Sequence, residues 1–408
     1  MTNSLASDWT TATLGDLCYF ENGDRGKNYP GRKALTSTGI PFINAGHLNN
    51  GQIDWAGMDF IPEEHFHRLG SGKIKRGDIL YCLRGSLGKF GLVDRNTEGA
   101  IASSLVIVRP TPNIQQRFLA YYFQSELARE MILTFAGGAA QPNLSAKSLK
   151  AFEIPLPPLE SQKRIVAVLD QAFAALDRAY ALVDANLSDT NSLYAAAVEI
   201  LFEDQSADWA RGNLSELVGT VHTGPFGSLL HKSDYIEGGI PLINPANIVD
   251  GQIKPNLSKT ISYEAAERLA AYKLKAGDLI IGRRGEMGRC APVKLEMNRW
   301  ICGTGCFVIR PHNEVLSDFV AYLLRRSNMV KRLTSIATGT TMLNLSNKAL
   351  SNMPIEMPRI DAQRHILERI DAIQLETRQS SDRYSVRLSH LTQLRQSLLH
   401  RAFSGGLA

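Results

Sequence analysis

Short apolar runs and longer helical periods alternate along this chain. Runs rich in apolar and β-branched residues, bounded by turn signals such as Arg-Gly-Asp and Arg-Pro, predict buried strands. They lie at 79–82, 104–108 and 279–281. Helical spacing of apolar residues follows at 118–123 and 319–324. This mixture predicts an α+β globular domain in each half of the chain.

The two halves are diverged copies of one unit. Ile-Pro-Phe-Ile-Asn at 40–44 returns as Ile-Pro-Leu-Ile-Asn at 240–244, a shift of 200 residues. The shift becomes 201 at the Arg-Pro pair, 109–110 and 310–311. Two large copies of one unit indicate two similar sites held at a fixed separation.

A Pro-rich joint and a long helix follow each domain. The joints at 154–158 and 353–358 should be extended, because proline fixes φ and biases the preceding residue away from helix. The following helices, each roughly 40 residues or near 60 Å long, carry apolar residues at steps of three and four, which demand a partner helix. The first seam is Val166, Leu169, Phe173, Leu176, Tyr180, Val183, Leu187, Thr190, Tyr194, Ala197 and Leu201; the second, looser seam is Ile366, Ile370, Ile373, Thr377, Tyr384, Leu388, Leu391 and Leu398.

Pairing the two helices with each other is the economical way to bury both seams. The first helix carries the chain from one domain to the other, so the second must return along it. This predicts an antiparallel coiled coil with one domain near each end, a dumbbell with an approximate two-fold axis. The alternative is that each helix packs on its own domain or on another subunit.

Composition narrows the class of protein without deciding it. The 408 residues are 44% hydrophobic and 21% charged, with a net charge of +5, which is compatible with a polyanionic partner. We expect no membrane span and no signal peptide, because long apolar runs and a basic N-terminal region are missing. Five unevenly distributed cysteines fit a reducing cytoplasm better than a disulfide framework, and we expect Cys302 and Cys306 to be buried free thiols.

Most candidate catalytic motifs fail on spacing. The Arg-Gly-Ser-Leu-Gly-Lys run at 84–89 has two residues between its glycines, where an ATP-binding phosphate loop has four. Asn244-Pro245-Ala246-Asn247 invites comparison with the Asn-Pro-Pro-aromatic signature of amino-methyltransferases. The first copy, however, has Asn-Ala-Gly-His there, and no glycine-rich dinucleotide-type loop follows a strand. Cys302 and Cys306 have no second cysteine pair and no histidine at ligand spacing. No catalytic set repeats between the copies, which argues against an enzyme, although a single-copy site remains open.

Glycine-punctuated loops that carry Arg and Lys do repeat. Glycine permits close backbone approach, and guanidinium groups suit phosphate or guanine edges. Each loop could equally be a solvated turn. The candidate contacts are Arg25, Lys27, Arg32, Lys33, Arg84, Gly85, Lys89 and Gln141 in the first domain, and His231, Lys232, Arg283, Arg284, Gly285, Arg289, Thr340 and Thr341 in the second.

The order of these motifs, given twice, resembles the specificity (S) subunit of type I restriction–modification systems over essentially the whole chain. The matching segments are the Gly-Asp-Ile-Leu and Gly-Asp-Leu-Ile strand entries, the Arg-Gly-x-x-Gly loops, the Asn-Leu-Ser segments, the Gln-Lys-Arg-Ile and Gln-Arg-His-Ile helix starts, and the tail at 397–407. The first helix lacks the Phe-Ser-Gly tail of the second. The resemblance implies target recognition domains at 1–158 and 204–357, a central helical region at 159–203 and a distal one at 358–408.

The resemblance also implies a non-catalytic, cytoplasmic, DNA-binding subunit. Each domain would read one half of a split double-stranded DNA site, and the helices would set the spacing and dock two methyltransferase subunits. A restriction (motor–nuclease) subunit could join them. S-adenosylmethionine, ATP and Mg²⁺ would belong to these partners, and the chain itself would hold no cofactor or metal. The alternatives are a related system that cuts beside its split site, a coiled-coil adaptor that binds proteins, and a stand-alone nuclease.

Overall fold

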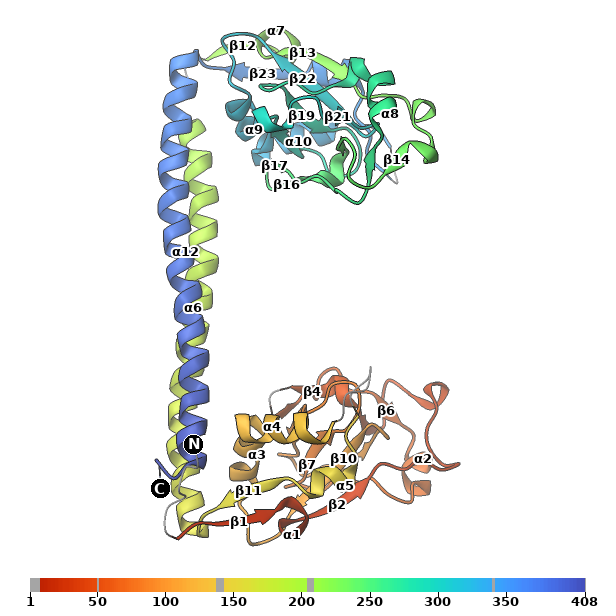
Figure 1. Ribbon diagram of the computed structural model, residues 1–408, viewed down its shortest axis with the longest axis vertical. Coiled ribbons are helices and arrows are strands. Elements are labelled where there is room, and N and C mark those ends of the chain that lie inside the picture. Colours follow the sequence, from red (N-terminus) through yellow and green to blue (C-terminus); the bar gives the residue numbers. More distant parts are fainter. Residues whose placement is uncertain (1–7, 50, 137–142, 204–208, 340–341, 408) are drawn as a thin grey trace. The chain divides into compact units, whose positions relative to one another are not determined.

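The computed structural model describes residues 8–49, 51–136, 143–203, 209–339 and 342–407. The chain forms two compact units, one made of Met1–Ala185 with Tyr384–Ala408 and the other of Asn186–Arg383. Each unit contains one globular domain and a segment of each long helix (Figure 1). We call the globular parts domain 1 and domain 2.

Domain 1 contains short strands and four- to ten-residue helices. Its elements are β1 (Thr10–Thr13), α1 (Leu14–Leu17), β2 (Cys18–Asn22), β3 (Ile40–Ile43), β4 (Leu48–Asn49), β5 (Gln52–Ile53), β6 (Phe60–Ile61), α2 (Glu63–Arg68), β7 (Ile79–Cys82), β8 (Phe90–Leu92), β9 (Ala100–Ile101), β10 (Leu105–Pro110), α3 (Gln116–Gln124), α4 (Glu126–Phe135), α5 (Ala146–Lys150) and β11 (Glu153–Leu156). The strand runs and the helical stretch expected from the sequence are thus confirmed as β7, β10 and α3.

Domain 2 repeats this order of elements with one additional strand, β14. They are β12 (Ala210–Asn213), α7 (Leu214–Leu217), β13 (Gly219–Thr223), β14 (Tyr235–Ile236), β15 (Leu242–Ile243), β16 (Ile248–Val249), β17 (Gln252–Ile253), β18 (Thr260–Ile261), α8 (Tyr263–Arg268), β19 (Leu279–Gly282), β20 (Cys290–Pro292), β21 (Ile301–Cys302), β22 (Cys306–Pro311), α9 (Ser317–Arg325), α10 (Ser327–Ile336), α11 (Asn347–Ser351) and β23 (Pro354–Met357). The expected strand at 279–281 and helix at 319–324 are β19 and α9.

Each domain is built on an antiparallel four-stranded sheet. The strand order is β2-β10-β7-β8 in domain 1 and β13-β22-β19-β20 in domain 2, and a separate pair, β1-β11 or β12-β23, joins the first and last strands. In β10, Val106 and Val108 belong to the larger core while Leu105 and Ile107 belong to a smaller one on the other face. Because both faces are covered, these strands are continuous apolar runs rather than alternating ones.

The larger core of the first unit joins domain 1 to both long helices, α6 (Leu159–Glu203) and α12 (Ile360–Phe403). Val166 and Leu169 of α6 and Leu399 and Phe403 of α12 are buried together with Phe118 of α3. The Phe118 and Phe403 ring centroids are 5.0 Å apart. The end of the chain is therefore part of the core of domain 1.

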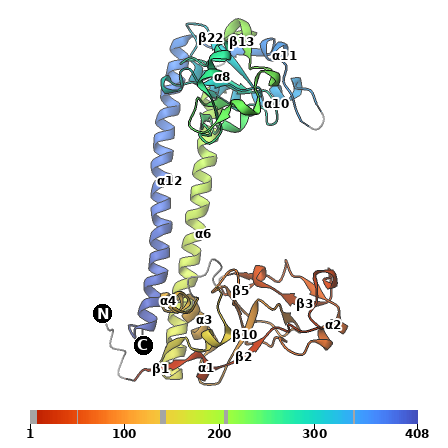
Figure 2. The ribbon, with the colours of Figure 1, turned by 45° about the vertical axis from the view of Figure 1, so that its right-hand side comes forward.

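The two helices run antiparallel in this unit. The Arg395 guanidinium donates to Asp177 at 2.9 Å and lies over the Phe173 ring, while the Tyr180 hydroxyl donates to the Leu388 carbonyl. Residue numbers therefore decrease along α12 in the direction in which they increase along α6. In the second unit Leu201 and Phe202 of α6 are buried with Ile366 and Ile370 of α12 in the core of domain 2. Within each unit the two helical segments lie side by side in both views (Figures 1 and 2).

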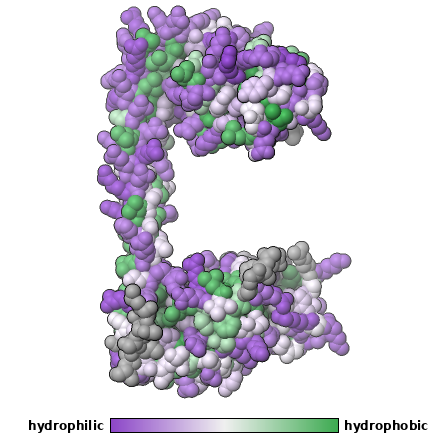
Figure 3. All heavy atoms as spheres, in the orientation of Figure 1, coloured by the Kyte–Doolittle hydropathy of each residue, from purple (hydrophilic) through white to green (hydrophobic). Residues whose placement is uncertain are grey.

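Both predicted seams match the buried and half-buried side of the helices. Every seam position on α6 and α12 has restricted exposure, whereas most positions between them are exposed. The outer helix surfaces in Figure 3 are mainly hydrophilic, with isolated apolar side chains. The α+β class and the antiparallel helix pairing are confirmed. No helix in the described part of the chain is long and apolar enough to span a membrane.

Candidate nucleic-acid interface

The repeated Arg-Gly-x-x-Gly segments are the hairpin turns between β7 and β8 and between β19 and β20. Their glycines have positive φ: 79° at Gly85, 80° at Gly88 and the same pattern at Gly285 and Gly288. A Cβ at Gly88 would lie 2.8 Å from the Ile132 side chain, and one at Gly288 would meet α10 at 2.6 Å. The first glycine of each pair is therefore required by φ alone, and the second also by close packing.

The Asn-Leu-Ser segments lie against these hairpins. Arg84 forms an isolated β-bridge with Asn143, and Arg284 forms the same bridge with Asn344. Next to the bridges, the Leu144 amide donates to the carbonyl of residue 83 at 3.0 Å, and the Leu345 amide to that of residue 283 at 2.8 Å. Two motifs 60 residues apart in sequence thus form one surface, and the same one in each domain.

The loop after the first sheet strand reaches the same end of the sheet. In domain 1 the Arg25 guanidinium donates to the Ser103 carbonyl at 3.2 Å, and the Leu83 amide donates to the neighbouring Ser104 carbonyl at 2.9 Å. In domain 2 the Asn347 side-chain amide donates to Val221 at 2.9 Å and contacts the Thr223 hydroxyl at 3.2 Å. We call the surface formed by these three loops the loop platform of each domain.

Several candidate cations of the loop platforms are exposed and available. Within the described part of the chain, these side chains have no ion pair or hydrogen bond to another residue. They are Lys27, Lys33, Arg84 and Lys89 in domain 1, and Lys232 and Arg284 in domain 2. Unpaired cations in glycine-rich loops are suited to phosphate or base contacts.

Two predicted cations of domain 2 have internal partners instead. Arg283 is half-buried, lies 5.2 Å above the Phe307 ring and contacts the Asn344 side chain at 3.4 Å. Burial, followed by the neighbouring Arg284 charge, lowers the pKa of Arg283 from its usual value. Arg289 donates to Glu286 at 2.8 Å within its own turn. These two arginines therefore stabilise the hairpin and are less available for contacts with another molecule.

The remaining predicted residues are either exposed or lie outside the described residues. His231 is exposed, and its backbone amide donates to Asp234 at 2.8 Å, which fixes the short turn at Lys232–Asp234. Gly85 and Gly285 lie at the exposed tips of the hairpins. Gln141, Thr340, Thr341 and the Arg32 side chain fall outside the described residues.

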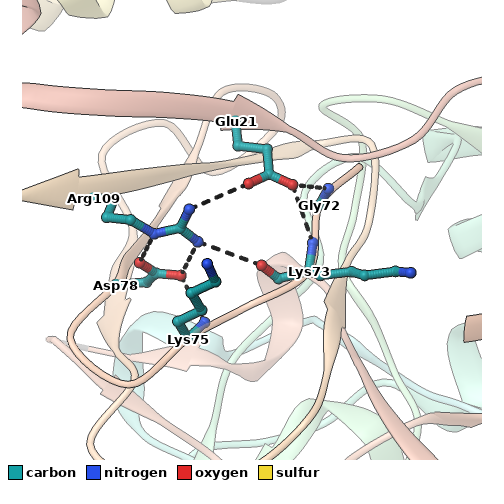
Figure 4. A network of polar contacts seen from close by, with 6 residues as sticks. All are labelled: Glu21, Gly72, Lys73, Lys75, Asp78 and Arg109. Carbon is teal, nitrogen blue, oxygen red and sulfur yellow. Dashed lines mark hydrogen bonds and ion pairs between the residues drawn. The ribbon is translucent and has the colours of Figure 1, made fainter. Parts of the chain in front are cut away.

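The opposite end of each sheet carries a buried ion pair that we did not predict. The Asp78 carboxylate, about 1% exposed, accepts from Arg109 at 2.7 and 2.8 Å and from the Lys75 amide at 2.7 Å. Glu21 is the second acidic partner of Arg109 and also accepts from the Gly72 amide (Figure 4). Hydrogen bonding to Asp78 raises the pKa of Arg109.

Domain 2 keeps only half of this network. Asp278 accepts from Arg310 at 3.0 and 3.2 Å and from the Lys275 amide at 2.9 Å. His222 occupies the strand position of Glu21, because Glu21 is opposite Ile107 and His222 is opposite Val308. The Gly-Asp and Arg-Pro segments that contain this ion pair recur in both copies. From the sequence alone they were interpreted only as turns.

A buried glutamine fastens each long helix to its domain. The Gln162 side chain accepts from the Gln115 amide at 2.8 Å and donates to Pro157 and Asn113 carbonyls at 2.9 and 3.3 Å. Gln363 makes the equivalent bonds with Leu316, Pro358 and Glu314 at 2.9, 2.9 and 3.1 Å. This glutamine explains the repeated Gln at the start of both helices. We call it the glutamine latch.

The cysteines and acidic groups form no additional site in the described residues. All five cysteines are free and buried, as was expected for Cys302 and Cys306. Burial raises the pKa of Cys18 to about 12, which keeps this thiol protonated. No group of three or more His, Cys, Asp or Glu side chains could hold a metal in the part of the chain that the structure covers.

Known proteins share both the sequence pattern and the fold. The family model described as "Type I restriction modification DNA specificity domain" matches residues 6–179 and 207–381. The type I restriction enzyme EcoKI specificity subunit of Escherichia coli (strain K12) is 22% identical, covering 99% of this chain and 90% of the relative. The StySPI specificity subunit of Salmonella potsdam is 23% identical with the same coverage.

Two solved structures have a similar fold. A chain from a type I R-M system, described for its complex assembly and conformational transition, superposes with a TM-score of 0.74 at 20% identity, and the match covers 98% of each chain. The HsdS subunit from Thermoanaerobacter tengcongensis gives a TM-score of 0.59 at 20% identity, again over 98% of each chain.

Proposed function

The chain belongs to the family of type I restriction–modification DNA specificity subunits, and on this premise we propose that each of its domains reads one half of a bipartite DNA site. The observation that carries the proposal is the repeated loop platform. Its hairpin and Asn-Leu-Ser segment make the same backbone contacts in both domains, while the exposed side chains of the hairpin and the first loop differ. A common scaffold with different exposed groups suits two readers of two sequences.

The unpaired cations give each platform two kinds of contact. Lysines such as Lys27 and Lys232 suit phosphate oxygens, which set register without reading sequence. Arg84 and Arg284 project from equivalent hairpin tips, where a guanidinium can form two hydrogen bonds with one guanine. We therefore assign base reading to the hairpin arginines and phosphate contact to the flanking lysines.

We further propose that α6 and α12 set the spacing between the half-sites and dock two methyltransferase subunits. The proposal is supported by helices of 45 and 44 residues whose ends share a core with a domain in each unit. The glutamine latch removes freedom at each joint. In this assignment the chain is non-catalytic. S-adenosylmethionine, ATP and Mg²⁺ belong to the methyltransferase and restriction subunits.

Selection from a random duplex library tests the assignment directly. The full chain with its methyltransferase subunits should enrich a split sequence with a spacer of fixed length. The matched test of spacing inserts one heptad into each helix, which adds about 10 Å of helix. The selected spacer should then lengthen by about three base pairs at 3.4 Å per step, with both half-sites unchanged. An unaltered spacer would remove the spacing role, and no enriched split sequence would remove the DNA-reading role.

A further inference from the structure

An exposed aromatic side chain belongs to the loop platform of domain 2. Phe226 is 72% exposed, and Leu229, three residues later, is 42% exposed. A single exposed apolar residue is ordinary on a protein surface. Phe226 differs by its place, because it lies in the loop between β13 and the exposed His231 and Lys232, on the surface proposed to meet DNA.

The backbone holds Phe226 outward on a rigid base. The Gly224 amide donates to the Cys306 carbonyl at 3.1 Å, and a Cβ at Gly224 would lie 2.2 Å from the Gly303 carbonyl oxygen. Pro225 is buried, and the Leu229 amide donates back to the Phe226 carbonyl at 3.0 Å to close a short turn. The ring is therefore presented with little backbone freedom left to lose on binding.

Domain 1 carries a cation at the same position. Gly23 and Gly224 each follow the first strand of the sheet, so Arg25 corresponds to Phe226, two residues after the glycine in each case. Arg25 is exposed, but its guanidinium donates to the Ser103 carbonyl. One platform thus places a charged group, and the other an aromatic ring, at equivalent points.

We propose that Phe226 is a specificity-determining residue of domain 2, whose ring packs against a base step of its DNA half-site. The inference rests on the proposed function and deepens it for one domain. A ring that stacks on a base needs that base partly separated from its neighbour, and pyrimidine–purine steps unstack most easily. The half-site read by domain 2 should therefore contain such a step, whereas that read by domain 1 need not.

The test compares variants of the full chain assembled with its methyltransferase subunits. Phe226→Ala removes the ring, Phe226→Leu keeps an apolar side chain without a flat face, and Phe226→Trp restores one. Leu295→Ala is the matched control, because Leu295 is 77% exposed in domain 2 beyond the far end of β20. Each complex is used to select from a duplex library with both half-sites randomised. Its affinity for the sequence selected by the unaltered complex is then measured.

The ring contact predicts a defined pattern of results. Phe226→Ala and Phe226→Leu should bind the selected sequence about tenfold or more weakly, which is the range for loss of one stacked aromatic side chain. Their selection should lose one step of the domain 2 half-site and leave the domain 1 half-site intact. Phe226→Trp and Leu295→Ala should behave as the unaltered complex. A 2-aminopurine base placed at the affected step should brighten on binding only when residue 226 is aromatic.

Three other outcomes separate the inference from its premise. If the unaltered complex and Phe226→Ala select the same split sequence with equal affinity, the inference is wrong and the proposed function stands. Full retention by Phe226→Leu also overturns it, because a thymine methyl contact or simple packing then suffices. If the unaltered complex selects no split sequence, the proposed function fails and the inference fails with it.

Discussion

Domains 1 and 2 differ least where their side chains are buried and most where their loops are exposed. Both keep the Asp–Arg pair at one end of the sheet, the two hairpin glycines at the other, and the glutamine latch at the helix joint. In the hairpin turn, however, Ser86 and the free Lys89 of domain 1 become Glu286 and Arg289, which pair with each other. In this turn the two domains therefore differ at exposed groups, while the glycines that fix the backbone are the same.

The same comparison explains how one scaffold can serve two sequences. Gly85 and Gly285 have a positive φ, so another residue there would strain the backbone. Gln162 and Gln363 each accept a hydrogen bond from a backbone amide, so an apolar replacement would leave that amide unpaired. An exposed side chain such as Arg25 or Phe226 has no such constraint. The positions that are free to vary are therefore those that can change what the domain binds.

The largest expected difference between the domains comes from the buried aspartates. Asp278→Ala leaves Arg310 without a carboxylate partner among the described residues, whereas Asp78→Ala leaves Arg109 near Glu21. Breaking a buried pair by removing one partner costs about 3–5 kcal/mol, less where water reaches the remaining charge. We expect Asp278→Ala to lower the free energy of unfolding of unit 2 by about 3 kcal/mol. Asp78→Ala should lower that of unit 1 by less. Hydrogen exchange at increasing denaturant concentrations measures the two units separately.

A second change makes the comparison sharper. His222→Glu places in domain 2 the carboxylate that domain 1 has in Glu21. Combined with Asp278→Ala, it should recover part of the lost stability of unit 2. Equal destabilisation by Asp78→Ala and Asp278→Ala, with no recovery, would show that Glu21 contributes nothing to the network.

The glutamine latches should behave alike in the two units. Gln162→Leu or Gln363→Leu leaves one buried amide and two carbonyls without their partners, at a cost of about 2 kcal/mol each. Thermal unfolding monitored by hydrogen exchange should show equal losses of stability for the two variants, each confined to the unit that carries the change. Gln379→Leu, at an exposed position on α12, is the control and should change little. A loss in one unit only would mean that the copies are held by different contacts.

The hairpin arginines should separate the two readers. Arg84→Ala should weaken recognition of one half-site, and Arg284→Ala of the other, by roughly 1–3 kcal/mol if they contact bases. Competition binding with duplexes altered in one half-site measures this. Arg76→Ala, an exposed cation at the opposite end of the domain 1 sheet, should leave both half-sites unaffected. Equal loss at both half-sites from either hairpin change would contradict the assignment of one domain to one half-site.

Sequence patterns predicted the parts of the fold that follow from local periodicity. The seams on α6 and α12 were found because alternating steps of three and four residues place a seam residue at nearly every helical turn, as at Leu169 and Ile370. The exposed hairpin tips at Arg84 and Arg284 were found because glycines marked the turn. Both signals are short-range, so one chain segment is sufficient to read them.

Contacts between distant segments could not be read in the same way. Asp78 and Arg109 are 31 residues apart, and Gln162 bonds to an amide 47 residues earlier. Their polar side chains carried no sign that they were buried. For the same reason Arg283 was taken for a surface cation, although Phe307 and Asn344 enclose it. The segments that contain Asp78, Arg109 and Gln162 recur in both copies, but only the three-dimensional pairing gives the reason.

The smallest expected difference between the domains is in their response to pH. Burial, and then the Arg310 charge, lower the pKa of His222 below its ordinary 6.5. A histidine whose pKa is depressed in the folded state stabilises the fold fully above about pH 6.5 and loses that contribution as the pH falls below it. Domain 1 has Glu21 at this position, so only unit 2 should show this pH-dependent contribution to stability.

His222→Gln separates the contribution of His222 protonation to stability from the titration of other groups. The stability of unit 2 in the unaltered chain, minus that in His222→Gln, should fall slightly between pH 7.5 and pH 5, because the protonated imidazole must then lie near Arg310 and Lys275. The exposure of the residue and screening by salt keep the change small. Hydrogen exchange of unit 2 at the two pH values measures it, with unit 1 as the internal control. A difference that grows as the pH falls would mean that Asp278, and not Arg310, dominates the field at His222, and that the two domains are electrostatically alike at this position.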